Sequence, residues 1–268
     1  MTPDPAKVRV WDARAAAYDR LVRRWEIFSQ LSNRLVDLLP PDLEGPVLDL
    51  GCGTGLTSQV LLDRHPRCRA ILIDPAEAMV DLARRNLHGR PAQFFAMDLD
   101  GARALDLRVV AVLASASMQF VDLEPAFGTL AALMTPGGHV AFNLWWHHWE
   151  ETAARNCMTQ WHDVAEAACR EVGIAPPPRT SPPPNVKNRP ELMDASRKHG
   201  FRLLAEYCDE YPTPIGFGCD FAAMDGDWPA RGLSGEARSA LLARMQALSQ
   251  GRVETQVSTR FLLQFASR

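Results

Sequence analysis

The sequence lacks several features that would place it in common classes of protein. None of its six cysteines stands in a C-x-x-C pair, so disulfide pairing and zinc binding are not favoured and buried, reduced thiols are expected. No segment has the roughly 18 consecutive apolar residues of a membrane span. Residues 1–9 carry no apolar stretch of the signal-peptide type. These absences predict a cytoplasmic protein with no membrane partner.

The sequence also has no large excess of positive or negative charge. The 29 lysines and arginines nearly balance the 32 aspartates and glutamates, and the formal net charge is -3. No run of basic residues stands out, so a nucleic-acid-binding groove is not expected. With 47% hydrophobic and 23% charged residues, the composition is typical of a globular protein with a substantial core. A length of 268 residues suits one large α/β domain, or such a domain with an inserted cap.

Short apolar strands alternate with helical segments through the first half of the chain. Strands are predicted at 46–50, 70–73, 93–97, 109–114 and 139–144, and helices at 5–21, 25–39, 56–64, 76–87 and 124–134. This alternation indicates a parallel sheet that helices cover on both faces. In such sheets ligands bind at the carboxyl ends of the strands.

The alternation stops after residue 144. The following segments are predicted as an aromatic helical stretch at 145–172, a proline-rich loop at 176–184, a helix at 190–199, a strand at 201–211, a helix at 234–249 and a strand at 253–266. We therefore predict one domain over 1–268. Its parts are N-terminal lid helices (1–40), a ligand-binding core (46–144), cap inserts (145–189 and 215–250) and closing strands (190–214 and 251–268).

A glycine-rich turn after the first strand is the strongest signal of function. It contains Gly51, Gly53 and Gly55, and Asp49 precedes it. Glycines there permit positive φ angles and let a ligand lie against bare backbone. Dinucleotide-binding loops use G-x-G-x-x-G around a pyrophosphate, whereas this loop is G-x-G-x-G. The acid before it would repel a pyrophosphate but suits the ammonium group of an amino acid.

Acids also follow the second and third predicted strands. Asp74 stands 19 residues after Gly55, where a carboxylate can accept both hydroxyls of a ribose. Because dinucleotide-binding proteins use an acid in the same way, Asp74 alone does not distinguish the two kinds of cofactor. Asp98 follows the third strand. An acid therefore stands at or after the end of each of the first three predicted strands.

The stretch Asp49-Leu-Gly-Cys-Gly-Thr-Gly55 resembles the first motif of class I S-adenosylmethionine-dependent methyltransferases. The resemblance covers roughly 11–142 and the closing strands, and is greatest to small-molecule methyltransferases related to ubiquinone- and biotin-pathway enzymes. It implies a Rossmann-like α/β fold with a seven-stranded, mostly parallel sheet, helices on both faces and a helical cap. It also implies S-adenosylmethionine as the cofactor.

The resemblance further implies roles for individual residues. The positions that it assigns to cofactor binding are Tyr18, Asp49, Gly51, Cys52, Gly53, Gly55, Asp74, Pro75, Met79, Asp98, Leu99 and Ser115. In that family the glycines and the first acid hold the methionine part, the second acid the ribose, and the residues around the third acid the adenine. Tyr18 belongs to the pattern Trp11-Asp12-x5-Tyr18-Asp19, whose helix closes over the cofactor in relatives.

The substrate side is harder to assign. Gln119, Trp145, Trp146 and Trp149 are predicted to line it, because an aromatic wall suits a flat or apolar acceptor. Candidate catalytic residues are Tyr18, His147 and His148, since a histidine can deprotonate a phenol, an acid or an ammonium group. The alternative is that the tryptophans pack the cap and the histidines are exposed. No spacing supports a metal site.

The sequence thus predicts methyl transfer to an oxygen or nitrogen of a small, aromatic or apolar molecule. Carbon or sulfur acceptors, or another reaction that uses S-adenosylmethionine, are the first alternative. A non-catalytic protein that binds S-adenosylmethionine or S-adenosylhomocysteine for regulation is the second. An NAD-dependent oxidoreductase is disfavoured by the glycine spacing and by Asp49. The acceptor and the oligomeric state stay open.

Overall fold

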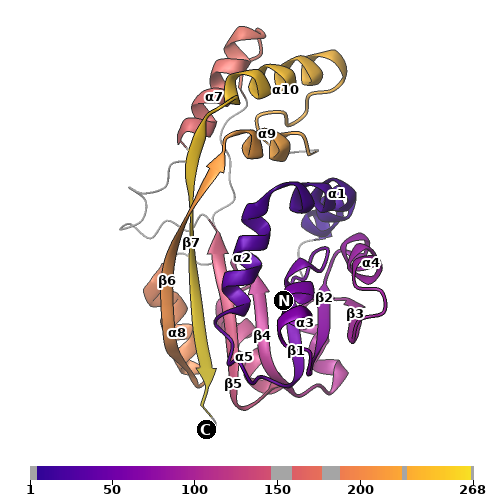
Figure 1. Ribbon diagram of the computed structural model, residues 1–268, viewed down its shortest axis with the longest axis vertical. Coiled ribbons are helices and arrows are strands. Elements are labelled where there is room, and N and C mark those ends of the chain that lie inside the picture. Colours follow the sequence, from indigo (N-terminus) through magenta and orange to yellow (C-terminus); the bar gives the residue numbers. More distant parts are fainter. Residues whose placement is uncertain (1–4, 146–158, 177–187, 225–227, 267–268) are drawn as a thin grey trace.

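A twisted seven-stranded sheet runs through the computed structural model, which describes residues 5–145, 159–176, 188–224 and 228–266 (Figure 1). The strands are β1 (Gly45–Leu50), β2 (Cys68–Asp74), β3 (Ala92–Ala96), β4 (Val109–Ser115), β5 (Met134–Trp145), β6 (Phe201–Pro214) and β7 (Val253–Phe265). Their order is β3-β2-β1-β4-β5-β7-β6. The first five pair in parallel, and β7 is antiparallel to both its neighbours. The predicted mostly parallel α/β sheet is confirmed.

Helices cover both faces of the sheet. Those described are α1 (Pro5–Arg24), α2 (Glu26–Val36), α3 (Leu56–Arg64), α4 (Glu77–Asn86), α5 (Leu123–Leu133), α7 (Thr159–Glu171), α8 (Arg189–Lys198), α9 (Gly216–Ala222) and α10 (Gly235–Ser249), with short 3-10 turns η1 (Gly101–Leu105) and η2 (Met118–Phe120). On one face Leu48, Val112 and Phe142 pack with residues of α5 and α8. On the other, Val47 and Leu113 pack with residues of α2 and α3. Successive residues of the central strands are buried on opposite faces, so these strands are apolar along most of their length.

The carboxyl-terminal half of the second N-terminal helix, α2, packs against the sheet. Leu35 and Val36 are fully buried and pack with Val47 and Leu61. This part of the predicted lid is therefore a layer of the core, because its apolar face matches that of α3 and the sheet. Helix α1 differs, since it contacts α4 and crosses the carboxyl ends of the strands (Figure 1).

Strand β6 is longer than the sequence predicts. It continues past Tyr211 to Pro214 and pairs with β7 over its whole length. This added part contains Pro212 and Pro214, and β6 is the edge strand of the sheet. Alternate N–H groups of an edge strand point away from its neighbour, so prolines two residues apart remove no bond of the ladder. The long β6–β7 pair extends beyond the other strands and carries the cap (Figure 1).

The cap has a core of its own, built from α7, α9 and α10. Ala168, Leu241 and Met245 are among its fully buried members. Residues 146–158 and 177–187 lie outside the described residues, and with them most of the predicted aromatic helix and the proline-rich loop. Within the described residues, no helix has the length and apolarity that crossing a membrane requires.

Gly218 in α9 allows the cap to close. The indole ring of Trp161 occupies the place that a Cβ on Gly218 would take. We predict that Gly218→Ala lowers the free energy of unfolding by about 1–3 kcal/mol, because a packed ring must move. Urea unfolding measures this. Gly216→Ala in the same helix is the control, since its Cβ would meet only ordinary contacts at 3.6 Å and beyond. Equal effects of the two substitutions would contradict the prediction.

Candidate functional site

The glycine-rich turn lies where β1 ends and α3 begins. Gly51, Gly53 and Gly55 have φ angles of +66°, +52° and +90°, a region that side chains rarely tolerate. A Cβ on Gly51 would lie 2.6 Å from the Cβ of Ser117, so the turn also passes tightly against the end of β4. The N–H groups of Gly51 and Cys52 donate to the carbonyl of Ile73 at 2.9 and 3.1 Å. The turn is therefore fastened to the end of β2.

Asp74, the last residue of β2, holds two neighbouring segments together. One carboxylate oxygen accepts the N–H of Gly53 at 3.0 Å, and the other accepts the N–H of Ala76 at 2.9 Å. Burial raises the pKa of Asp74, the two N–H groups lower it in part, and the charge of Asp12 raises it further. Pro75 is exposed beside it, and Met79 is buried one turn into α4. Asp74, the residue predicted to bind the ribose, thus lies at the end of the strand, next to the glycine turn.

Asp49 lies beneath the turn rather than at its surface. It is 1% exposed and accepts a hydrogen bond from the Ser58 hydroxyl at 2.6 Å. Burial raises its pKa to about 6, although the hydrogen bonds from Ser58 oppose this. The described partner of Asp49 is therefore the first turn of α3. Cys52, also buried, points its thiol at the carbonyl of Gly53.

The third predicted acid, Asp98, stands in the loop after β3. Its carboxylate accepts the N–H of Gly101 at 2.8 Å and so shapes the entry into η1. Leu99 beside it is 6% exposed. Because β3, β2 and β1 are adjacent and parallel, Asp98, Asp74 and Asp49 come to the same edge of the sheet. Among the described residues, none of these three acids forms an ion pair.

Tyr18 covers the glycine turn from α1. Its ring lies 3.6 Å from where a Cβ on Gly53 would be, and it meets Trp11 and Phe28 edge-on at centroid distances of 5.6 and 5.8 Å. Burial raises the pKa of Tyr18 far above its usual range, and the charge of Asp74 raises it further. Burial therefore favours the protonated hydroxyl, which can donate a hydrogen bond.

A small polar network ties α1 to the turn. The side-chain amide of Asn86 donates to Asp19 and to the carbonyl of Thr54, both at 2.9 Å. Arg23 donates to the Asn86 carbonyl at 2.7 Å and pairs with Asp19 at 2.9 Å. Asp12 accepts the N–H of Ala78 at the start of α4, also at 2.9 Å. The sequence pattern contained Asp12 and Asp19, but nothing in the sequence marked Asn86.

The end of β4 supplies the fourth side of the site. Ser115 ends the strand, and Ala116 follows it in the left-handed region with φ +51°. The N–H of Ala116 donates to Asn143 at 3.0 Å, and Asn143 is 1% exposed at the end of β5. Sequence reasoning missed Asn143, although a polar residue inside the apolar stretch 140–144 was a signal.

Two further contacts complete this side. The hydroxyl of Ser117 donates to the carbonyl of Leu50 at 2.5 Å and so joins β4 to the glycine turn. The side-chain amide of Gln119 donates to the carbonyl of Ala116 at 2.8 Å, while its carbonyl oxygen is buried without a described partner.

Several predicted substrate residues are not described. Trp146, His147, His148 and Trp149 lie outside the described residues. Trp145 is the last residue of β5 and pairs with Ser258 on β7. Within the described part of the chain, no group of three or more histidine, cysteine or acidic residues is arranged to hold a metal ion.

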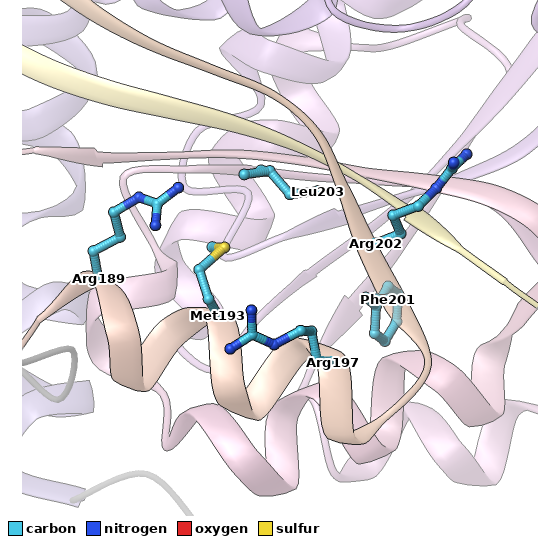
Figure 2. A pocket seen from close by; sticks show the side chains of 6 residues that line it. All are labelled: Arg189, Met193, Arg197, Phe201, Arg202 and Leu203. Carbon is cyan, nitrogen blue, oxygen red and sulfur yellow. The ribbon is translucent and has the colours of Figure 1, made fainter.

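A surface hollow of about 340 Å³ lies elsewhere, between α8 and the start of β6 (Figure 2). Its lining residues are Arg189, Met193, Arg197, Phe201, Arg202 and Leu203. Each arginine has a partner: Arg189 pairs with Glu206 at 2.7 Å, Arg197 with Asp194, and Arg202 donates to Gln264. Phe201 opens a strand parallel to β5, so the hollow lies at the end of the sheet opposite the acids.

Comparison with known proteins agrees with this geometry. Residues 47–138 match the model of a methyltransferase domain family. The chain is 31% identical over 125 residues to a malonyl-[acyl-carrier protein] O-methyltransferase of Acetivibrio thermocellus. The aligned region covers 46% of this chain and 44% of the relative. The chain is 37% identical over 100 residues to a trans-aconitate 2-methyltransferase of Acidovorax sp., 37% of each chain. The matched part thus spans less than half of these relatives.

Solved structures resemble most of the chain. A geranyl diphosphate methyltransferase in complex with SAM superposes with a TM-score of 0.52 at 14% identity, covering 92% of this chain and 90% of that one. The cyclopropane synthase MmaA2 from Mycobacterium tuberculosis gives a TM-score of 0.54 at 10% identity, covering 88% and 84%. At such identities the likeness is one of fold.

Fold and site together define an α/β domain with a glycine turn and three acids at the carboxyl edge of a parallel sheet. Residues 47–138 match a methyltransferase domain, and the fold is that of solved S-adenosylmethionine-dependent methyltransferases.

Asn86 provides a test of how α1 is held over the turn. We predict that Asn86→Leu speeds hydrogen exchange in α1 and costs about 1–3 kcal/mol of folding stability, because the Thr54 carbonyl loses this donor and Asp19 loses it while keeping Arg23. Hydrogen exchange with mass spectrometry measures this. Asn33→Leu is the control, since Asn33 bonds within α2 to the Ser29 carbonyl and outside it only to Arg64. Unchanged protection of α1 in the Asn86 variant would argue against the network.

Proposed function

We propose that the chain binds S-adenosylmethionine at the carboxyl edge of β1, β2 and β3 and transfers its methyl group to an oxygen or nitrogen of a small molecule. The observation that carries this proposal is the position of Asp74. It ends β2, touches both the glycine turn and the start of α4, and has no described cation as a partner. The malonyl and trans-aconitate methyltransferases among the relatives support methyl transfer to a small or carrier-bound acceptor.

The carboxylate of Asp74 can serve the protein and a ribose together. Two oxygens offer about four lone-pair positions, and the N–H groups of Gly53 and Ala76 take two of them. Two remain for the hydroxyls of a ribose. Leu99, next to Asp98, and Met79, in the first turn of α4, are buried apolar residues that suit the two faces of an adenine. The bare backbone from Gly51 to Gly53 suits the methionine part.

Charge favours a cationic ligand at this edge. Asp49, Asp74 and Asp98 approach it from three strands without a described ion pair. A sulfonium and an ammonium group bring positive charge to carboxylates that otherwise have none nearby, and partial burial strengthens that attraction. The same carboxylates repel the pyrophosphate of NAD.

The sulfonium of the bound cofactor supplies a methyl group with its leaving group already attached. The residues of this chain need to hold an acceptor in line with that methyl and exclude water. Tyr18 and Trp11 cover the site from α1, and Gln119 offers a buried carbonyl oxygen beside it. Asp74 and the glycine turn would hold the cofactor, which would supply the methyl group to the lone pair of the acceptor and retain the electron pair of the carbon–sulfur bond. The acceptor's proton then leaves to water or to a base.

Aromatic residues favour an acceptor with an apolar body. Phe28, Phe217 and Phe221 lie within 6.4 Å of one another between ring centroids. Tyr18 and Ala116 border the same cluster, so it reaches the end of β4. Aromatic walls of this kind suit flat or apolar molecules.

Calorimetric titration tests the cofactor. We expect binding of S-adenosylmethionine and S-adenosylhomocysteine and no binding of NAD. Asp74→Asn should weaken binding of both sulfur compounds by roughly 10- to 100-fold, since it removes charge-assisted hydrogen bonds worth about 1.5–3 kcal/mol each. Asp81→Asn is the control, because Asp81 lies on α4 and pairs only with the exposed Arg84. Unchanged affinity in a folded Asp74 variant, or binding of NAD, would overturn the assignment.

A further inference from the structure

Three polar residues of β7 are buried where the strand leaves the sheet. Glu254, Gln256 and Ser258 are 3%, 1% and 3% exposed. Alternate residues of a strand point to the same face, so the three form one row. Asn143 on β5 continues the row, because its amide donates to the Ser258 hydroxyl at 3.2 Å. We call these four residues the polar strip.

The strip connects the site to the cap. At one end Asn143 accepts the N–H of Ala116, directly after β4. At the other end the amide of Gln256 donates to Glu254 at 2.8 Å, and the carboxylate of Glu254 accepts the N–H of Trp161 at 3.1 Å. Trp161 stands in the first turn of α7. The strip therefore runs from the predicted methyl-transfer end to the base of the cap.

The aromatic cluster lies on the same side of the sheet as the strip. Gln256 is the antiparallel partner of Tyr211, and paired residues of neighbouring strands share a face. Tyr211 packs in the cluster that contains Phe28 and Phe217 and that Ala116 borders. An acceptor placed at the end of β4 would thus meet aromatic rings on one side and the polar strip on the other.

Glu254 has a structural role that explains part of its burial. A carboxylate at the first turn of a helix is favourable, and Glu254 holds α7 in this way. Even so, within the described residues no lysine or arginine forms an ion pair with it. Burial raises its pKa to about 7, while hydrogen bonds from Trp161 and Gln256 and the charge of Arg252 lower it in part. An isolated buried carboxylate is costly unless a donor or a cation reaches it.

Asp209 provides a comparison on the same face. It is the antiparallel partner of Ser258 and is also buried, but Arg34 pairs with it at 2.7 Å and Arg260 pairs with it as well. The two arginines beside the strip are therefore already engaged. A carboxylate acceptor at the strip would face the carboxylate of Glu254, which forms no ion pair within the described residues.

We propose that the polar strip binds the polar group of the methyl acceptor and selects hydroxyl- or amine-bearing apolar molecules over carboxylate anions. This proposal rests on the proposed function and specifies its substrate class. It separates this chain from the malonyl and trans-aconitate enzymes among its relatives, whose named substrates carry carboxylates. A hydroxyl or ammonium group donates to Glu254 or to the hydroxyl of Ser258, while the apolar part lies against Phe28 and Phe217.

Probe binding to protein saturated with S-adenosylhomocysteine tests the strip. The probes are 2-phenylethylamine, 2-phenylethanol and 3-phenylpropanoate, which share a phenyl body and differ in the polar group. We expect the amine and the alcohol to bind at least about tenfold more tightly than the carboxylate, as measured by calorimetry or ligand-observed NMR. Equal or tighter binding of the carboxylate, or no binding of any probe at millimolar concentration, would overturn the proposal.

Substitutions in the polar strip test whether its residues cause the preference for the amine over the carboxylate. Glu254→Gln should reduce the preference for the amine over the carboxylate to less than about threefold, because the charge is removed while the shape is kept. Glu210→Gln, an exposed acid on β6, is the matched control and should leave the preference as it is. If Glu254→Gln fails to fold, Ser258→Ala still tests the strip, since it should weaken the amine and the alcohol by severalfold. An unchanged preference in a folded Glu254 variant, or unchanged affinities in Ser258→Ala, would refute the strip.

The S-adenosylhomocysteine titration of the wild-type protein comes first and separates the two proposals. Absence of that binding refutes the proposed function, and the strip proposal falls with it. Binding of S-adenosylhomocysteine without discrimination among the probes refutes the strip alone.

Discussion

The carboxylate of Asp74 is the contact on which the rest of the site depends. Its two oxygens accept N–H groups from the glycine turn and from the start of α4, segments that are separate in sequence. Because the carboxylate stands at a strand end, it fixes both segments relative to the rigid sheet. Helix α1 is then fastened to the same two segments, through Asn86 to the turn and through Asp12 to α4. Helix α1 is thus positioned over the site by the glycine turn and the start of α4, the same segments that Asp74 holds.

The cap is connected to helix α1 by α9. Asp220 of α9 accepts the indole N–H of Trp25 at 2.8 Å and pairs with Arg24 at 3.1 Å, so it holds the junction of α1 and α2. On the cap side, Gly218 admits the ring of Trp161. A short helix therefore links two apolar clusters that are otherwise separate, one above the glycine turn and one in the cap. Packing of this kind makes closure over a ligand a property of several elements together.

Much of the core was predictable because its signals are local. Apolar strands alternating with helices, a glycine turn with positive φ angles, and acids at strand ends all follow from short stretches of sequence. Predictions failed where the tertiary context reversed a local signal. Pro212 and Pro214 argue against a strand, yet an edge position makes them harmless. The second half of α2 has the pattern of any amphipathic helix, and only its packing against Val47 and Leu61 identifies it as a layer of the sheet.

The class of fold, the glycine turn and the three acids were predictable, because each depends on residues close together in the chain. Which groups meet in space depends on contacts between distant residues. Asn86 reaches α1 across 67 residues, and Asn143 reaches Ser258 across 115. The tertiary structure also revealed that Asp49 lies beneath the turn against Ser58 and that Glu254 lacks a described counter-charge. Hydrogen bonds between distant residues leave no local pattern, since a polar side chain looks the same in the sequence whether it is solvated or buried with a partner.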